Sequence, residues 1–305
     1  MKSFVGVFGH TAIDVILEVP SLPEPNTSIG LDKKTIRYGG TGANIARCAS
    51  ELDVSVSLAS FVGDDFPEDY REALIDSQVQ IYDLKEIEGH NTTKVWIITD
   101  VEENQMAVVD QGAMKYSSKF DLQKETIKNS DIIHIGTGRP EYYERVIKLA
   151  NELNKKICFD PAQELKYVYN SDNLPKIIEN SDLFFCNETE LSIALEYLKL
   201  NDPMELFDHL ETFIVTKGNE GSILYHDDKK TKIPAFKPDK INEPTGAGDA
   251  YRAGFYAARY REYDIVESCK IASARASFTV ESAGPQENLI DWKTLIERYQ
   301  SNNTM

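Results

Sequence analysis

The sequence predicts a three-layer α/β/α fold with a mainly parallel central sheet and a small antiparallel β lid. Two observations predict it. Short apolar runs alternate with helical stretches along most of the 305 residues, which is typical of a parallel sheet covered on both faces. Four other segments within the first 111 residues alternate apolar and polar side chains, which is typical of an antiparallel sheet with one face in water.

The central sheet is predicted to begin with residues 3–9, an apolar run that ends at a glycine. Later strands are predicted over residues 54–62, 131–135, 156–160, 183–186 and 211–216, followed by a hairpin of residues 221–226 and 231–234. Helices are predicted over residues 66–76, 141–154, 188–199, 247–261, 265–281 and 291–299. Ligands of such sheets bind beyond the carboxyl ends of the strands, so the turns there form the candidate site.

The lid is predicted from residues 15–19, 30–37, 94–99 and 106–111, which are linked by turn residues. These segments interrupt the alternation of strands and helices. We therefore expect a separate sheet, formed by about residues 12–37 and 92–113, that covers a site on a single domain spanning residues 1–305.

The composition excludes two classes of partner. With a formal net charge of −17, the chain lacks the basic face that nucleic acids and anionic membrane surfaces require. An acidic protein still binds a nucleotide if backbone N–H groups and a metal ion neutralise the phosphates locally. The sequence shows no secretory signal and no apolar membrane span, and its four cysteines form no C-x-x-C pair. We expect a cytoplasmic protein with reduced, buried thiols.

A glycine-rich turn within residues 243–255 runs directly into a predicted helix. The N–H groups of Gly246, Ala247 and Gly248 at a helix N-terminus form an anion site, because no bulky side chains cover them. Asp249 then lies beside that site, where its carboxylate can take a proton from an attacking hydroxyl group. The alternative is structural: Thr245 caps the helix and Asp249 only complements the helix dipole. Seen alone, this turn does not decide between the two.

Other nucleotide-binding motifs are absent from the sequence. It contains no G-x-x-x-x-G-K-[ST] loop and no H-R-D or D-F-G element of protein kinases. A dinucleotide-binding fingerprint at Gly40 and Gly42 fails, because Ile45 occupies the position of the third glycine.

Four motifs in order resemble those of the ribokinase (PfkB) family of sugar and nucleoside kinases. The first is Tyr38 to Asn44 (YGGTGAN) with Val62-Gly63-Asp64 after it, and the second is Asn187-Glu-Thr-Glu190. Thr216 to Gly221 (TKGNEG) and Gly246 to Gly254 (GAGDAYRAG) are the third and fourth. The resemblance spans essentially the whole chain. It implies an ATP-dependent kinase in which Asp249 is the base and the turn of Gly246, Ala247 and Gly248 is the anion hole.

The resemblance also implies a nucleotide site with Mg²⁺. It assigns Glu190 to Mg²⁺ through water, and it assigns the following residues to ATP: Asn187, Thr216, Gly218, Gly221, Ser273 and Ser277. Each has a structural alternative. Asn187 and Glu190 match a helix capping box, Thr216 and Gly218 match a simple turn, and the two serines match small residues on a packed helix. Dependence on potassium is left open.

For the acceptor, the resemblance implies that Asp14, Gly40 and Asn44 bind sugar hydroxyls. The stretches 9–14 and 23–28 look most like the broad-specificity nucleoside kinases of archaea, in which the ribose 5′-hydroxyl is phosphorylated. On this interpretation the lid covers the base. Gln111 is a candidate for a hydrogen bond to the base edge, and Trp96, Ile98 and Met106 are candidates for apolar contacts or for the lid's own core.

Arg139 follows a predicted strand end, and it keeps a second interpretation open. A guanidinium group there can grip a sugar phosphate or a sugar acid, which favours a 6-phosphofructokinase or a 2-keto-3-deoxygluconate kinase. A ribokinase and a fructokinase are the other sugar-kinase alternatives. Pairing of Arg139 with a surface carboxylate is the structural alternative. A non-catalytic sugar- or nucleoside-binding regulator is a third possibility, which the intact Gly246–Asp249 turn disfavours.

Two smaller expectations complete the interpretation. Lid sheets in this family often pair between subunits, so the resemblance implies a homodimer through the lid. Asp53 stands where a glycine is expected after a helix, and an aspartate tolerates the left-handed conformation that such a position requires.

Overall fold

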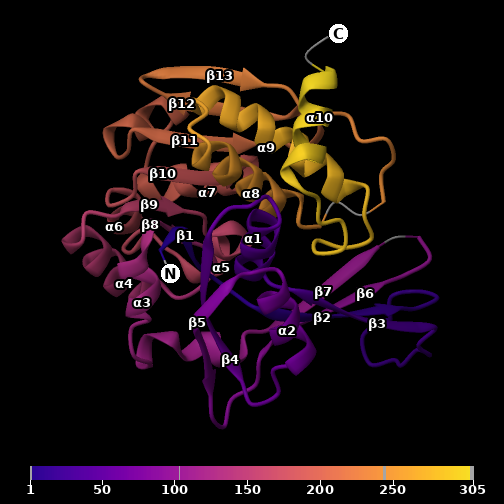
Figure 1. Cartoon of the computed structure of the whole chain (residues 1–305). Coiled ribbons are helices and arrows are strands. Elements are labelled where there is room, and N and C mark those ends of the chain that lie inside the picture. Colours follow the sequence, from indigo (N-terminus) through magenta and orange to yellow (C-terminus); the bar gives the residue numbers. More distant parts are fainter. Residues whose placement is uncertain (1, 103, 243–244, 303–305) are drawn as a thin grey trace.

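A computed structural model describes residues 2–102, 104–242 and 245–302. Its main sheet has nine strands in the order β13-β12-β11-β10-β9-β8-β1-β4-β5 (Figure 1). The strands are β1 Ser3–Phe8, β4 Val56–Gly63, β5 Gln80–Ile87, β8 Ser130–Ile135, β9 Lys156–Phe159, β10 Leu183–Asn187, β11 Thr212–Thr216, β12 Ser222–His226 and β13 Lys229–Ile233. All neighbouring pairs from β5 to β11 are parallel, and the hairpin of β12 and β13 adds an antiparallel edge.

Helices cover both faces of this sheet. One layer consists of α1 Thr41–Ser50, α8 Ala247–Tyr260, α9 Ile265–Val280 and α10 Trp292–Asn302. The other consists of α3 Lys124–Asn129, α4 Pro140–Glu152, α5 Leu165–Val168, α6 Leu174–Ile178 and α7 Glu188–Leu198. The short helix α2 Glu68–Asp76 lies near the lid (Figure 1). The predicted three-layer α/β/α fold is therefore confirmed.

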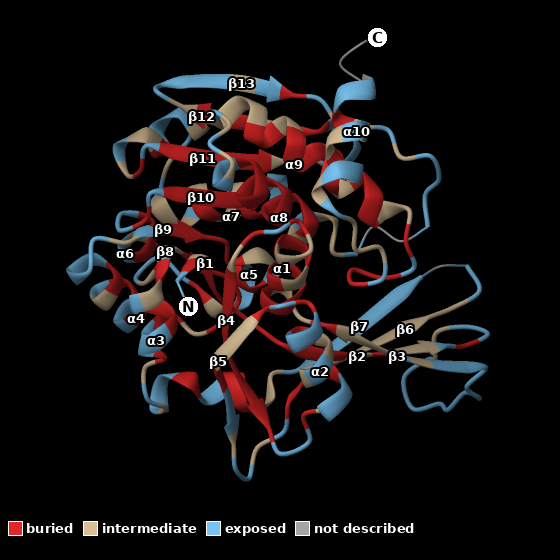
Figure 2. Cartoon of the chain, in the orientation of Figure 1, coloured by how far each residue is buried: buried red, intermediate tan, exposed pale blue. Residues whose placement is uncertain are grey.

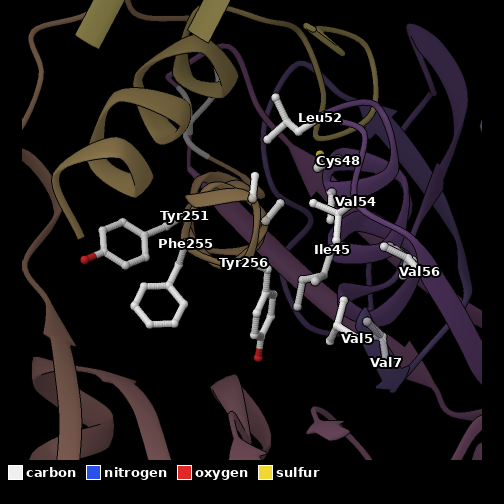
Figure 3. Close-up of a cluster of buried hydrophobic side chains, with 14 of the residues drawn as sticks. Val5, Val7, Ile45, Cys48, Leu52, Val54, Val56, Tyr251, Phe255 and Tyr256 are labelled. Atoms are coloured by element: carbon white, nitrogen blue, oxygen red, sulfur yellow. The ribbon is translucent and has the colours of Figure 1, made fainter. Parts of the chain in front are cut away.

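The two faces of the sheet carry separate hydrophobic clusters, because successive side chains of a strand point to opposite faces. Val5 and Val7 of β1 belong to the cluster under α1, α8 and α9, whereas Phe8 belongs to the cluster under α4 and α7. In the first cluster, Tyr256 of α8 lies opposite Ile45 of α1 (Figure 3). The inner strands β1, β4, β10 and β11 are almost entirely buried, whereas the edge strands β5 and β13 are partly exposed (Figure 2).

The lid is a second sheet of four strands in the order β3-β2-β6-β7. Its strands are β2 Ala12–Glu18, β3 Lys33–Gly39, β6 Thr93–Thr99 and β7 Gln105–Asp110. The two outer pairs are antiparallel, and the central pair, β2 and β6, is parallel. The sheet projects to one side of the main body (Figure 1), and β7 is exposed along its whole length (Figure 2).

The structure differs from the sequence interpretation in a few elements. Strand β5 was not predicted, and neither were the short helices α3, α5 and α6. Asp53, which lies shortly after the end of helix α1 at Ser50, adopts φ = 60°, as expected for a position where a glycine was anticipated. Within the described residues, no helix is long and apolar enough to cross a membrane.

Candidate active site

The glycine turn forms the N-terminus of helix α8, as the sequence predicts. Gly246 is the N-cap residue with φ = 80°, and a side chain at this position would collide with Pro285. Glycine is therefore required here both by the backbone conformation and by the close neighbour. The first N–H groups of a helix have no partner within it, so the turn presents donors to an anion. Glu243 and Pro244, the first residues of the glycine-rich segment 243–255, lie outside the described residues.

Asp249 lies in the first turn of α8 and is half-buried. Burial raises the pKa of its carboxyl group to about 7, although a hydrogen bond from Asn44 acts in the opposite direction. The Asn44 Nδ2 atom donates to Asp249 Oδ2 over 2.7 Å. A carboxyl group with a pKa near neutrality is well matched to the work of a general base.

Asn44 is itself held by a chain of hydrogen bonds. Gln286 Nε2 donates to Asn44 Oδ1 over 2.7 Å and lies 2.9 Å from the hydroxyl oxygen of Tyr70, while Arg47 donates to Gln286 Oε1 over 2.7 Å. These contacts fix the Asn44 amide so that its nitrogen faces Asp249. Gln286 belongs to the segment before α10 and was not predicted as a site residue.

A buried ion pair lies directly behind the glycine turn. Arg252, one turn after Asp249, donates to both carboxylate oxygens of Asp160 over 2.8 and 3.0 Å. It also donates to the carbonyl oxygen of Gly248 over 3.3 Å. The pair therefore ties the start of α8 to the carboxyl end of β9. Neither residue was predicted, but a charged side chain within the apolar face of a helix is a recognisable signal of such a pair.

Asp14 lies on lid strand β2 and faces the same region as Asp249. Burial raises the pKa of its carboxyl group to about 6, and the positive charge of Arg37 opposes this shift. The negative charge of Asp14 contributes to the raised pKa of Asp249, so the two carboxylates are close enough to interact. Gly39 lies directly under the Asp14 carboxylate, where a side chain would collide with it.

Gly40 joins the lid to helix α1. It adopts φ = 92°, and a Cβ atom there would lie only 2.5 Å from the carbonyl oxygen of His10. The structure thus brings four predicted residues to one place, namely Asp14, Gly40, Asn44 and Asp249.

The register of the lid separates its residues into two faces, because directly paired residues lie on the same face. Asp14 pairs with Arg37 and Val95, which therefore share its face. Trp96 pairs with Val15 and Val108 on the opposite face, and Ile98 pairs there with Met106. Trp96, Ile98 and Met106 therefore lie on the face of the lid opposite to Asp14.

A second polar cluster surrounds Glu164, which is 2% exposed and ends the 3₁₀ turn Ala162–Glu164 after β9. Its Oε1 atom accepts from Gln111 Nε2 over 2.5 Å, and its Oε2 atom accepts from the Gly138 N–H over 2.5 Å. Arg139 donates from NH2 to Gln111 Oε1 over 2.9 Å. Burial raises the pKa of the Glu164 carboxyl group to about 7. The structure thus brings the predicted residues Gln111 and Arg139 together around a carboxyl group that was not predicted.

The predicted metal residue Glu190 forms the complete capping box of helix α7. Its N–H donates to Asn187 Oδ1 over 2.9 Å, and its carboxylate accepts from the Asn187 N–H over 2.8 Å. Burial and the negative charge of Asp160 raise the pKa of Glu190. Among the described residues, no group of three or more His, Cys, Asp or Glu side chains is arranged to hold a metal ion. Oxygen ligands from Glu190 and Asp160 nevertheless suit Mg²⁺, which takes few direct protein ligands and retains several waters.

The remaining nucleotide candidates differ in their surroundings. Gly218 has φ = 56° and open space where a side chain would project, which leaves room for a ligand. Gly221 is explained by the hairpin, because a side chain there would collide with the backbone of Ile233. Thr216 donates to the carbonyl oxygen of Cys186 over 3.3 Å.

Ser273 and Ser277 are buried on helix α9. Their hydroxyl groups donate to the carbonyl oxygens of Pro234 over 2.9 Å and Ala274 over 2.7 Å. This arrangement fits the packing alternative, and their role at the adenine stays a prediction.

The chain is similar to known kinases over almost its whole length. Residues 2–292 match the pfkB family of carbohydrate kinases. The chain is 40% identical to a nucleoside kinase of Methanocaldococcus jannaschii over 295 residues, which cover 96% of this chain and 95% of that protein. It is 36% identical to a nucleoside kinase of Methanothermobacter thermautotrophicus over 294 residues, which cover 95% of this chain and 94% of that protein.

Solved structures agree with these similarities. The crystal structure of the M. jannaschii nucleoside kinase matches with a TM-score of 0.90 and 37% identity, covering 98% of this chain and 99% of that one. The structure of a Burkholderia thailandensis nucleoside kinase in complex with ADP-inosine matches with a TM-score of 0.86, covering 99% of this chain and 96% of that one. At 20% identity, the second match supports the fold alone.

Proposed function

The chain belongs to the pfkB family of carbohydrate kinases and is an ATP-dependent kinase, and we propose that its phosphate acceptor is the ribose 5′-hydroxyl of a nucleoside. The observation that carries the proposal is the position of Asp249. Its carboxylate lies beside the open N-terminus of α8, and Asn44 and Asp14 lie next to it. Relatives that are 36–40% identical over at least 95% of this chain are nucleoside kinases.

In the proposed reaction, Asp249 takes the proton of the 5′-hydroxyl as its oxygen attacks the γ-phosphorus of ATP. The bond between the γ-phosphorus and the bridging oxygen breaks, and ADP leaves with the electron pair. The N–H groups of Gly246, Ala247 and Gly248 stabilise the negative charge on the transferring phosphoryl group. The Arg252–Asp160 pair holds this turn in position through Gly248.

Asp14 and Gly40 are proposed to bind the ribose. The Asp14 carboxylate accepts hydrogen bonds from sugar hydroxyls, and the bare backbone at Gly40 allows the sugar to approach closely. With Asp14 on its inner face, the lid closes over the sugar and excludes water, which otherwise competes as phosphoryl acceptor.

Mg²⁺ is part of the proposal, with Glu190 as its protein ligand through water and Asp160 nearby. When bound, the ion neutralises phosphate charge that this acidic chain cannot neutralise with a basic surface. Thr216, Gly218 and Asn187 are proposed to line the ATP site. A dependence of the reaction on potassium is tested by measuring kcat with K⁺ and with Na⁺ at constant ionic strength. An unchanged kcat would show that potassium has no role in the reaction.

A sugar kinase is the second candidate, and Arg139 is the observation that favours it. Its Nε atom is buried and, among the described residues, has no hydrogen-bond partner. An acidic or phosphorylated sugar offers such a partner. A non-catalytic regulator is disfavoured, because Asp249 and the glycine turn are intact.

A homodimer through the lid is also proposed. The lid face opposite Asp14 carries apolar side chains that are partly or largely exposed, namely Leu17, Ile36, Trp96, Ile98, Met106 and Val108. Ile36, Met106 and Val108 are 56%, 47% and 54% exposed. An apolar face of this kind is typical of a surface that is covered in an assembly. We place the protein in the cytoplasm, since its four cysteines are unpaired and buried.

One assay tests the proposed acceptor. ADP release from ATP is measured with a panel of nucleosides, ribose, fructose, fructose 6-phosphate and 2-keto-3-deoxygluconate. We expect strong turnover with nucleosides. Turnover with only a free sugar, a sugar phosphate or a sugar acid would contradict the proposal.

A further inference from the structure

Glu164 has no role in the proposed chemistry, yet its buried carboxyl group is the centre of a polar cluster. Gln111, Gly138 and Tyr167 all have atoms within hydrogen-bond distance of its two oxygens. His10 Nε2 lies 4.0 Å from Glu164 Oε1, and this nitrogen is buried with no hydrogen-bond partner in the described part of the chain. Burying a carboxyl group costs free energy unless its partners compensate, so such a cluster calls for an explanation.

The cluster fixes the orientation of the Gln111 side chain. A guanidinium group only donates hydrogen bonds, so the atom of Gln111 that faces Arg139 must be its oxygen. The amide nitrogen then faces Glu164, whose carboxylate accepts the bond. A flipped amide would turn its NH₂ group toward Arg139 and its oxygen toward the carboxylate, and both contacts would be repulsive. The second N–H of Gln111 lies within hydrogen-bond reach of Tyr167. This N–H, shared with Tyr167, and one oxygen lone pair are therefore the groups that Gln111 offers to a ligand.

The cluster lies beside the substrate face of the lid. Gln111 follows directly after β7, and its carbonyl oxygen accepts from Thr93 Oγ1 over 2.9 Å. Thr93 pairs with Ala12, two residues before Asp14 on the same strand, and so shares the face of Asp14. The Gln111 side chain therefore reaches from this face of the lid to the loops that follow β8 and β9.

A path of contacts connects this cluster with the opposite end of the site. Asp249 contacts Asn44 on helix α1, and Gly40 at the start of that helix lies against the backbone of His10. His10 Nδ1 lies 2.7 Å from Thr137 Oγ1, in the loop between β8 and α4 that also contains Gly138 and Arg139. An acceptor with its reacting hydroxyl group at Asp249 would thus extend toward Gln111 with its other end.

We propose that Glu164 is a specificity-determining residue that acts by positioning Gln111. It holds the Gln111 amide in one orientation, so that the amide distinguishes the order of donor and acceptor groups on the edge of the nucleobase. The inference rests on the proposed nucleoside kinase function. A freely rotating amide accepts either order, whereas a fixed amide matches only one of them.

Glu164 also balances the charge of Arg139. The two side chains interact electrostatically, and Gln111 bridges them. At this end of the site, the charges of Glu164 and Arg139 therefore compensate each other. Such surroundings suit a neutral polar base better than a phosphate group.

Inosine and adenosine test the proposal, because the two nucleosides differ only in the order of the hydrogen-bond donor and acceptor at C6 and N1 of the base. Inosine has an oxygen acceptor at C6 and an N1–H donor, and adenosine has an amino donor at C6 and an N1 acceptor. We measure kcat/KM for both at pH 8 with the wild type, Glu164→Gln and the exposed control Glu125→Gln. The glutamine of Glu164→Gln keeps the shape of the side chain and can still accept from Gly138. Its NH₂ group then faces the NH₂ group of Gln111 and opposes the orientation that Arg139 favours, so the amide is no longer held in one orientation.

We expect kcat/KM of the wild type to differ about tenfold between the two nucleosides, as for other fixed donor–acceptor pairs. Glu164→Gln is expected to bring the two values within about twofold of each other, whereas Glu125→Gln leaves the ratio unchanged. If Glu164→Gln does not fold, Glu164→Asp serves instead, since its shorter side chain withdraws the carboxylate from the Gln111 amide while keeping the negative charge beside Arg139, and it is expected to reduce the same discrimination.

Two results would overturn the inference while leaving the nucleoside kinase intact. One is equal use of both nucleosides by the wild type, and the other is a variant that retains the ratio of the wild type. If no nucleoside is phosphorylated, the proposed function itself fails, and the inference fails with it.

Discussion

Asp249 is under opposing influences, and in the proposed reaction their balance sets the pH dependence of kcat. Burial raises the pKa of its carboxyl group to about 7, and the hydrogen bond from Asn44 opposes the shift. A general base is active only when ionised. Asp249 is therefore expected to be fully active above neutral pH and to be switched off by protonation below it.

The first prediction is a pH profile of kcat at saturating nucleoside and ATP. Because the ionised form is the active one, kcat is expected to fall about tenfold per pH unit below pH 7 and to level off above it. The same raised pKa lowers stability as pH rises, since the folded state holds its proton up to about pH 7 and the unfolded chain releases it near 4. A flat profile of kcat from pH 5 to pH 8 would contradict the role of Asp249.

The second prediction concerns the buried pair of Arg252 and Asp160. Asp160 is 4% exposed, so Arg252→Met would leave its charge buried without compensation. The free energy of unfolding, measured with urea, is expected to fall by about 3–5 kcal/mol. The control is Arg71→Met, which breaks a partly exposed pair with Glu86 and is expected to cost at most about 1 kcal/mol. Equal losses in the two variants would refute the structural role of Arg252.

At the scale of elements, the two faces of the lid have different surroundings. One carries Asp14 and Arg37 and faces the site, and Arg37 Nε lies 3.1 Å from the Glu287 carboxylate in the segment before α10. Where the lid joins the main body, the other face packs on that body through Tyr38. The Tyr38 ring stacks on the ring of Tyr70 of α2, with 4.2 Å between the ring centroids. Beyond that contact its apolar side chains are exposed.

The third prediction tests what covers this apolar face. Light scattering during size-exclusion chromatography is expected to show a dimer for the wild type and a monomer for Val108→Lys, because a charge among the exposed apolar side chains of this face opposes association. Val101→Lys is the control, since Val101 is 77% exposed in the turn between β6 and β7. The idea is wrong if the wild type is a monomer or if Val108→Lys still forms a dimer.

Most elements were predictable because their hydrophobic periodicity is strong. Strand β5 was missed because Gln80–Ile87 is an edge strand in which only two consecutive residues are buried, and its mixed sequence QIYDLKEI shows no continuous apolar run. The parallel pairing of β2 with β6 was also not predictable, because alternation shows which residues share a face but not the direction of the neighbouring strand.

The candidate site was only partly predictable from sequence. Asp249, Asn44 and Asp14 belong to motifs, and the structure brings them together. Gln286 contacts Asn44 across 242 positions in the sequence, and no local pattern indicates such a contact. Glu164 and Arg252 are charged residues that become buried, and burial of a charge depends on partners that only the fold supplies.

At the scale of the whole molecule, the two sheets are expected to behave as one domain. The fourth prediction uses the two tryptophans of the chain, Trp96 in the lid and Trp292 in α10, as separate reporters. The variants Trp96→Phe and Trp292→Phe each leave one reporter. Urea unfolding followed by fluorescence is expected to give the same midpoint for both. An earlier transition for the lid reporter would show that the lid unfolds independently.

In the proposed reaction, one carboxylate accepts the proton of the substrate, although the whole protein is acidic, with a net charge of −17. In the same proposed reaction, the N-terminus of α8 and Mg²⁺ neutralise the phosphate charge, and the acceptor loses its proton to a group already in place. In this account Asp249 is that group.

The most direct test is therefore kcat of Asp249→Asn with a nucleoside and ATP, beside the exposed control Asp131→Asn. The asparagine keeps the shape of the side chain and cannot take the proton. We predict that kcat falls by about 10²–10⁴ for Asp249→Asn, while its melting temperature is unchanged or higher and the control keeps full activity. An Asp249→Asn variant with the kcat of the wild type would contradict the central claim.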